Sequence, residues 1–73
     1  MELDYKAIGK RIKIARIQAE LSQEALAEKA DLSPTHMSNI ENANTKLSLP
    51  MLISIANALS VSADTLLCDS VIH

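Results

Sequence analysis

The chain has 73 residues, of which 48% are apolar and 22% charged, and its formal net charge at pH 7 is −2. This length suffices for one domain with a small core, and that core must be aliphatic because the chain contains no Phe or Trp and only one Tyr. A single glycine, two prolines and no alternating β-branched run disfavour hairpins. We therefore predict an all-α fold, with residues 1–73 forming one domain that ends in a tail at 68–73.

Several classes of protein are disfavoured by what the sequence lacks. Its apolar runs are shorter than the roughly 20 residues of a membrane span, and no apolar segment typical of a signal peptide is present, so we expect no membrane association. A lone Cys68 disfavours a disulfide framework or a zinc site and favours a reducing, cytoplasmic setting. With two His, no glycine-rich phosphate loop and no cluster of metal ligands, we expect no cofactor, no metal and no enzymatic activity.

The first predicted helix covers about 4–18, with Asp4 as its N-cap. Gly9 weakens this helix by roughly 1 kcal/mol relative to Ala, which suggests close packing against a neighbour. Ile14 and Ile17 lie off the buried stripe and are expected to be partly exposed. The buried stripe itself is formed by residues at helical spacing: Ile8, Ile12, Ala15 and Ala19.

Basic residues concentrate in this first helix, although the whole chain is slightly acidic. A local basic face can attract a polyanion even when the net charge of the domain is negative. The simpler interpretation is a solvated helix face. Five of the seven basic residues belong to this group: Lys6, Lys10, Arg11, Lys13 and Arg16.

Two short helices follow, at about 23–30 and 34–41, and a tight turn joins them. Ser22 and Ser33 stand at the N-cap positions, and Pro34 occupies a first helical position, where its missing N–H costs nothing. Asp31 lies at the turn, and Asp tolerates a left-handed backbone. One apolar seam joins the two helices, which is the pattern of a helix-turn-helix: Leu26, Ala27, Ala30, Leu32, Met37 and Ile40.

After a polar loop at 42–47, Ser48 is the predicted N-cap of a fourth helix at about 49–59, with Pro50 in its first turn. Ser62 caps a short fifth helix at 63–67. The tail 68–73 carries no strong signal. The predicted apolar face of the fourth helix contains Leu49, Leu52, Ile53, Ala56 and Leu59.

Four segments resemble the lambda-repressor/Cro-like helix-turn-helix domain of the XRE family, and together they cover over four-fifths of the chain. They are IGKRIK at 8–13, LSQEALAEKA at 21–30, LSPTHMSNIEN at 32–42 and LISIANALSVSADTLL at 52–67. The resemblance implies a five-helix lambda-repressor-like bundle that binds double-stranded DNA. It does not indicate which sequence is bound.

In this family the second helix of the motif is the recognition helix, whose outer residues face the major groove. The resemblance therefore implies base contacts by Pro34, Thr35, Ser38 and Asn39, although these residues could also be plain polar surface. Pro34 departs from the family because it offers no donor. The resemblance also implies that Gln23 braces the recognition helix, and it implies phosphate contacts by Gln23, Ser33, Asn42, Lys46, Arg11 and Lys13. For Ser33, helix capping alone is an equally good explanation, as is a solvated face for Arg11 and Lys13.

The resemblance further implies a structural ion pair between Arg16 of the first helix and Glu41 at the end of the recognition helix. A second departure is Ala43, where the family commonly has Gly. The left-handed residue that ends the recognition helix is then expected at Asn42 or Asn44, or lost. His36 is expected to pack at the edge of this helix or to face a phosphate, and Met37 is expected in the core.

Two functions are compatible with the sequence. The first is a sequence-specific transcriptional repressor acting as a homodimer on a pseudo-palindromic operator, because one recognition helix reads only a few base pairs. The second is a protein-interaction module on the same fold, an antitoxin-like protein or a partner of a regulator with weak affinity for DNA. The dimer contact is expected from the fifth helix and the tail, at Leu66, Leu67, Val71 and Ile72.

Overall fold

The structure is a computed structural model that describes residues 4–67. Within that range it contains five helices and no strand, which confirms the all-α prediction and each helix boundary to within one residue. The helices are α1 (Tyr5–Gln18), α2 (Gln23–Lys29), α3 (Pro34–Glu41), α4 (Leu49–Leu59) and α5 (Ala63–Leu67).

Every helix begins with the predicted capping side chain. Asp4 accepts a hydrogen bond from the backbone N–H of Ala7 at 3.1 Å, and the serine hydroxyls at 22, 33 and 48 do the same for the residue three positions later. Ser62 caps the short α5 in the same way. Each bond satisfies one of the N–H groups that a helix start leaves without a partner, so the helix starts are fixed by local sequence.

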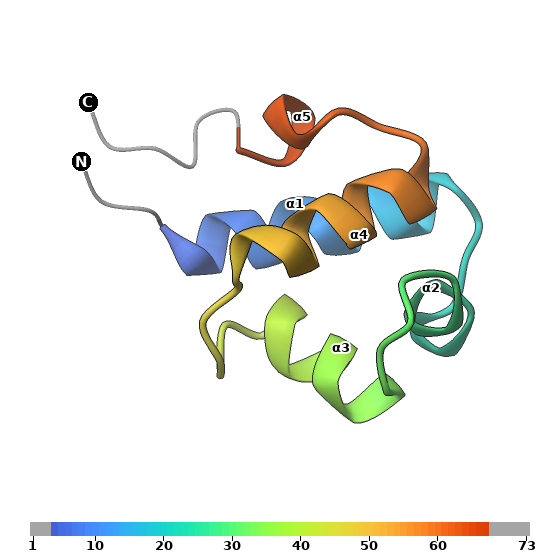
Figure 1. Ribbon diagram of the computed structural model, residues 1–73, viewed down its shortest axis with the longest axis horizontal. Helices are drawn as coiled ribbons and strands as arrows, with labels where there is room; N and C mark the ends of the chain where they lie inside the picture. Colours follow the sequence, from blue (N-terminus) through green and yellow to red (C-terminus); the bar gives the residue numbers. More distant parts are fainter. Residues whose placement is uncertain (1–3, 68–73) are drawn as a thin grey trace.

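The helices form a small bundle centred on α1 and α4. Figure 1 shows α2 and α3 on one side of this pair and α5 on the other. Helix α1 contacts α3, α4 and α5, while α2 contacts α3 and α4. The helix-turn-helix unit α2–α3 is therefore held by the two central helices, and α3 keeps one side free.

The core is aliphatic, as the composition required. The predicted seam between α2 and α3 is buried, except that Leu32 is only half-buried, and Met37 is fully buried. Ile14 and Ile17 are exposed as expected. The core residues are Ile8, Ile12, Leu26, Ala27, Ala30, Met37, Ile40, Leu52, Ile55, Ala56, Leu59 and Leu66.

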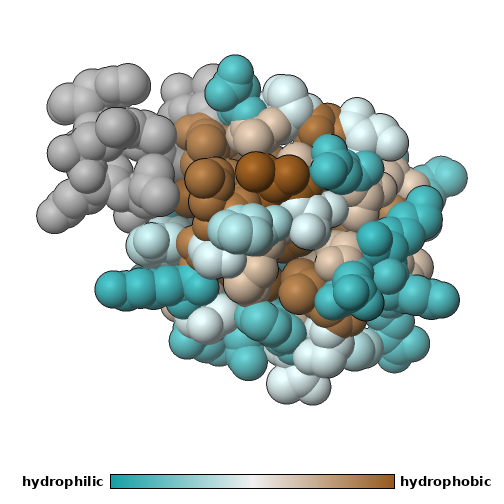
Figure 2. Space-filling view, viewed as in Figure 1, coloured by the Kyte–Doolittle hydropathy of each residue, from teal (hydrophilic) through white to brown (hydrophobic). Residues whose placement is uncertain are grey.

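The predicted buried faces of two helices need correction. In α4, Leu49 and Ile53 are 66% and 45% exposed, whereas Ile55, which was not predicted, is fully buried. The neighbours of α4 cover the stripe through 52, 55, 56 and 59, which is rotated from the predicted one. Figure 2 shows apolar side chains gathered on the face where α4 lies. In α1, Ala19 is exposed because the helix ends one residue before it, at Gln18.

Four helices end with a left-handed residue, and none of the four is glycine. For α3 this residue is Ala43 (φ 58°), so the prediction of Asn42 or Asn44 was wrong. The reason is the hydrogen bonding: Ala43 N–H donates to Ile40 O at 3.1 Å and Asn44 N–H to Asn39 O at 2.8 Å. This pair of bonds requires the left-handed conformation at 43, whichever residue is there. The other left-handed residues are Glu20, Asp31 and Ser60.

The single glycine lies instead where α1 crosses α3. A Cβ atom on Gly9 would lie 2.6 Å from the backbone oxygen of Glu41 and 2.7 Å from that of Ile40. The close packing expected at Gly9 is therefore confirmed, and its partner is the backbone of the recognition helix. Any side chain at position 9 would push α3 away from α1.

Candidate DNA-binding surface

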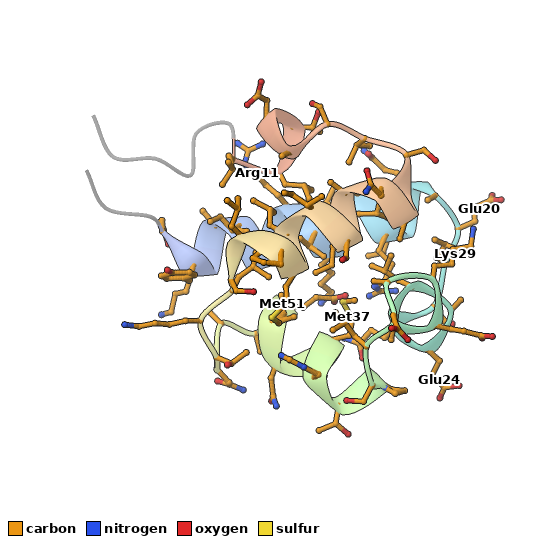
Figure 3. The ribbon with its side chains drawn as sticks, in the orientation of Figure 1. Arg11, Glu20, Glu24, Lys29, Met37 and Met51 are labelled. Carbon is orange, nitrogen blue, oxygen red and sulfur yellow. The ribbon has the colours of Figure 1, made fainter. Side chains whose placement is uncertain are left out.

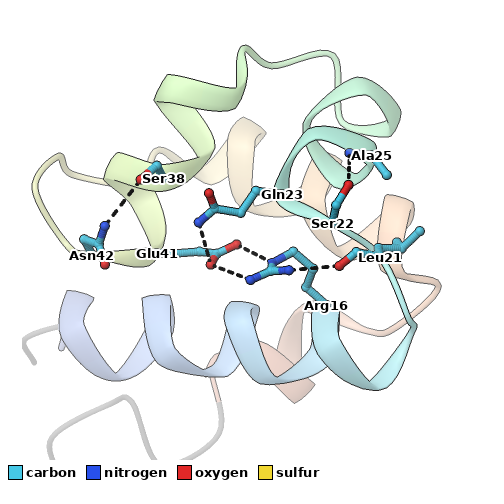
Figure 4. A network of polar contacts seen from close by, with 8 residues as sticks. All are labelled: Arg16, Leu21, Ser22, Gln23, Ala25, Ser38, Glu41 and Asn42. Carbon is cyan, nitrogen blue, oxygen red and sulfur yellow. Dashed lines mark hydrogen bonds and ion pairs between the residues drawn. The ribbon is translucent and has the colours of Figure 1, made fainter.

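A buried polar cluster joins α1, the start of α2 and the end of α3 (Figure 4). The ion pair predicted between Arg16 and Glu41 is present, with Arg16 Nε 2.9 Å from Glu41 Oε2. Arg16 Nη2 donates to Glu41 Oε1 at 3.3 Å, and Gln23 Nε2 donates to the same oxygen at 3.1 Å. Arg16 Nη1 donates to the backbone oxygen of Leu21 at 2.9 Å.

This cluster leaves the buried charge of Glu41 fully compensated. The Glu41 side chain is 1% exposed and that of Arg16 is 12% exposed, so two charges have been taken out of water. Such burial is tolerable only when the geometry is good and the remaining polar atoms are paired, and both carboxylate oxygens are paired here. Because the three hydrogen bonds to its carboxylate come from Arg16 of α1 and Gln23 of α2, Glu41 ties the end of α3 to the rest of the bundle.

The outer side of α3 carries the polar residues for which base contacts were predicted. Pro34 and Thr35 are exposed, and Ser38 and Asn39 are half-buried. His36 is also half-buried, at the edge of the helix. The inner side of α3 carries Met37 and Ile40 in the core. One side of the helix is thus anchored while the other presents hydroxyl and amide groups.

Four of the six residues predicted to contact phosphates lie at the start of α2, at the two ends of α3 and in the loop that follows α3. Ser33 and Asn42 flank α3 and are exposed, as is Lys46 in the following loop. Asn42 Nδ2 also lies 3.4 Å from Ser38 Oγ, to which it donates. Gln23 uses one of the two N–H groups of its amide on Glu41, so it braces the recognition helix.

The sequence of this chain matches a known protein family. The model of the helix-turn-helix family matches residues 12–66, which is most of the chain. The chain belongs to the XRE-type helix-turn-helix family of DNA-binding transcription regulators. This confirms the resemblance seen in the sequence.

Relatives of this helix-turn-helix regulator include an immunity repressor protein of Bacillus phage phi105, 37% identical over 59 residues. That match covers 81% of the chain but 41% of the repressor, so the chain spans about two fifths of the repressor's length. Among solved structures, the restriction-modification controller protein C.AhdI from Aeromonas hydrophila is 28% identical with a TM-score of 0.84, over 86% of this chain and 96% of that one. The P22 c2 repressor protein in complex with a synthetic operator is 28% identical with a TM-score of 0.77, over 93% and 97% of the two chains. The lambda-repressor-like fold is thereby confirmed.

The structure separates two residues that the sequence placed together. Lys13 lines the same groove as Asn42, on the α3 side of α1. Arg11 lies instead with Ile14, Gln18 and Thr65, and Figure 3 shows it next to α5, away from α3. Residues two apart on a helix point in very different directions. Arg11 is therefore badly placed to contact the same DNA backbone as Lys13.

The residues expected at the dimer contact are also divided. Leu66 is fully buried in the core, so its side chain offers no surface to a second copy, and that part of the expectation was wrong. Leu67 is half-buried beside a small apolar groove of about 110 Å³. Val71 and Ile72 lie outside the described residues, as does Cys68.

Residues 4–67 of this helix-turn-helix regulator contain no group of three or more His, Cys, Asp or Glu side chains arranged to hold a metal ion. Within the same range, no helix is both long enough and apolar enough to cross a membrane.

Two features of the site were not recognised in the sequence. One is the partner of Gln23: the resemblance implied that Gln23 braces the recognition helix, but not that it does so through Glu41, which depends on how α2 meets α3. The other is the common face shared by Lys6, Lys10 and Lys13 on α1. Their spacing of four and three residues is the signal that could have separated them from Arg11.

Proposed function

We propose that this chain is a sequence-specific transcriptional repressor that binds double-stranded DNA as a dimer on a pseudo-palindromic operator. The observation that carries the proposal is the anchoring of α3. Its inner side is held by the core and by the buried Glu41 cluster, while its outer side presents Thr35, Ser38 and Asn39. A helix that reads bases must keep a fixed orientation, because bidentate hydrogen bonds tolerate little displacement.

The chemistry of this surface assigns a role to each residue. The Asn39 amide can donate to N7 and accept from N6 of an adenine, the pairing that amide side chains favour in the major groove. Thr35 and Ser38 can bond to base edges, and Thr35 can also contact a thymine methyl group. Pro34 has only apolar contact to offer, so its base position should discriminate weakly. Gln23, Ser33, Asn42 and Lys46 would fix the register through phosphates.

Specific binding at useful affinity requires two copies. A single recognition helix reads a few base pairs, and two-fold related helices in repressors of this type lie about 34–36 Å apart, one turn of DNA. Leu67 stays in the proposed dimer contact, with Val71 and Ile72 of the tail, whereas Leu66 does not. The names of two similar proteins, an immunity repressor protein and a c2 repressor protein in complex with a synthetic operator, favour repression. We place this activity in the cytoplasm.

Selection from a randomised duplex library at moderate salt tests the proposal. The wild type should enrich a two-fold symmetric site, and Asn39→Ala should enrich the same site with one base position relaxed in each half. Asn57→Ala, which removes an exposed asparagine from α4 instead, should enrich the wild-type site. Failure of the wild type to enrich any sequence would overturn the proposal.

Salt dependence separates this function from a protein-interaction module. A DNA-binding protein that makes about six phosphate contacts should lose roughly three decades of affinity between 50 and 200 mM salt. Binding to a protein partner through apolar surface should change little over this range. A reporter gene placed behind the selected operator should be silenced by the wild type, and activation of that gene would contradict the repressor role.

A further inference from the structure

A groove with a volume of about 510 Å³ runs between the first half of α1 and the end of α3. Lys6, Lys10 and Lys13 line it on the α1 side, and all three are exposed. Their spacing of four and three residues places them one above another on a single helix face. The complete lining is Asp4, Lys6, Ala7, Lys10, Lys13, Glu41 and Asn42.

The charge of this groove is positive despite its two carboxylates. Glu41 is buried and bonded to Arg16 and Gln23, so its charge is compensated within the protein. Asp4 is exposed at the start of α1, where it caps the helix through the N–H of Ala7. Three lysines thus face one uncompensated carboxylate, which leaves a local excess of positive charge on a chain whose net charge is −2.

The groove is continuous with the outer side of α3. Asn42 lines the groove, and its side-chain amide donates to the hydroxyl of Ser38, one turn back along α3. Ser38 belongs to the surface proposed above to read bases. If the bases of a DNA strand contact Ser38, the neighbouring phosphates of that strand would therefore lie at the opening of the groove.

We propose that this groove is a second phosphate-binding site, which holds the DNA backbone beside the bases that α3 reads. The inference rests on the proposed function and extends it by assigning Lys6 and Lys10 together with Lys13. Seven residues of helix span about 10 Å along the axis, and one DNA strand places a phosphate every 3.4 Å or so of its own axis. The span thus covers about three phosphate spacings, so each of the three lysines can meet a phosphate of its own.

Such contacts add affinity without adding sequence information. Each neutralised phosphate releases condensed counterions and steepens the salt dependence by about 0.9 in the slope of log K against log salt. The groove should therefore contribute about 2.7 to that slope, equally for an operator and for an unrelated duplex. Base-reading residues such as Asn39 should instead change the ratio between the two affinities.

The first test replaces all three lysines by glutamine, which keeps the length of the side chains and removes their charge. We expect the slope to fall by about 2.7 and the affinity at 0.1 M salt to fall on the order of a hundredfold, by the same factor for the selected operator and for a scrambled duplex. An unchanged thermal unfolding midpoint would show that the exposed substitutions leave the fold intact. A variant with the wild-type slope would overturn the inference.

Single substitutions with equal charge changes locate the effect on the surface. Lys10→Glu and Lys29→Glu alter the net charge by the same amount, but Lys29 ends α2 and lies away from this groove (Figure 3). Lys10→Glu should lose at least tenfold more affinity than Lys29→Glu. Equal losses would mean that only net charge matters and would overturn the inference. Asp4→Asn keeps a capping side chain and should raise the affinity severalfold.

Modified DNA identifies the phosphates. Methylphosphonate groups, which carry no charge, can replace the phosphates flanking each half-site one at a time. Replacement at the positions that meet the groove should weaken the wild type and leave the triple variant unaffected, whereas equal weakening of both proteins would overturn the inference. A wild type that enriches no sequence would refute the proposed function alone, because a reduced salt slope in the triple variant would still support the groove.

Discussion

Two regions of the molecule differ in whether glycine is present where the backbone favours it. One is the crossing of α1 and α3, which has a glycine, and the other is the ends of the helices, which have none. At the crossing, the single glycine of the chain allows the α1 backbone to lie against the carbonyl groups of Ile40 and Glu41. At the helix ends, four residues adopt positive φ values near 60°, a conformation that favours glycine, yet they are Glu20, Asp31, Ala43 and Ser60. The glycine of this chain thus lies at a contact between helices, whereas residues with side chains adopt the strained left-handed backbone conformation in the turns.

The sizes of the two penalties account for this difference. A left-handed L-residue costs roughly 1–2 kcal/mol, and the cost stays within one turn that two backbone hydrogen bonds hold in place. A side chain at the crossing would instead displace the whole of α3, because the clashing atoms are backbone. Since α3 carries the proposed base contacts, a displacement there would affect function as well as stability.

The largest effect is expected from Arg16, which joins the same two helices as Gly9. Arg16→Ala would leave the Glu41 carboxylate buried with Gln23 as its remaining partner. Removing one member of a buried ion pair costs about 3–5 kcal/mol, a large part of the 5–15 kcal/mol that usually stabilises a domain. Urea unfolding would measure the loss, and an unchanged unfolding midpoint would refute the structural role of the pair.

A double-mutant cycle separates the ion pair from other effects of truncating Arg16. Arg16→Ala combined with Glu41→Ala removes the uncompensated charge, so the double variant should be less destabilised than the sum of the two single variants. Lys10→Ala on the exposed side of α1 is a suitable control and should change the free energy of unfolding by less than about 0.5 kcal/mol. Additive losses would mean that the two side chains act independently.

The second effect in size is expected from Gly9→Ala. Forcing an extra methyl group into a tight contact costs typically 1–3 kcal/mol, against which the better helix propensity of Ala returns about 1 kcal/mol. We expect a net loss of up to about 2 kcal/mol, with weaker operator binding under conditions where the variant is still folded. Ala7→Gly in the same helix calibrates the propensity term. A stabilised Gly9→Ala variant would show that α3 can move at little cost.

What the sequence predicted correctly depended mostly on local chemistry. The serines at 22, 33, 48 and 62 are followed by helical segments, and each helix starts where its cap stands. Asp31 takes the left-handed conformation expected from its side chain. The Arg16–Glu41 pair joins residues 25 positions apart, and only the resemblance to a family suggested it.

What the sequence did not predict depends on how the helices pack. Ile53 and Ile55 of α4 have the same side chain, and the neighbouring helices decide that Ile55 is buried and Ile53 exposed. Arg11 and Lys13 are both basic and close in sequence, yet one faces α5 and the other the end of α3. The roles of Thr35, Ser38 and Asn39 toward bases remain predictions, because they depend on a DNA partner.

The smallest effect is expected from adding glycine where the chain lacks it. Ala43→Gly would remove the left-handed penalty of roughly 1–2 kcal/mol but would also increase the conformational entropy of the unfolded chain, at a cost of about 0.5–1 kcal/mol. We expect a net gain of about 0.5–1 kcal/mol, measurable as a rise of a few degrees in the unfolding midpoint. Asp31→Gly should gain less, because Asp tolerates this conformation better than Ala. Equal gains at 31 and 43 would mean that Asp and Ala pay the same penalty in the left-handed conformation. Stability would then depend on glycine mainly at the crossing of α1 and α3.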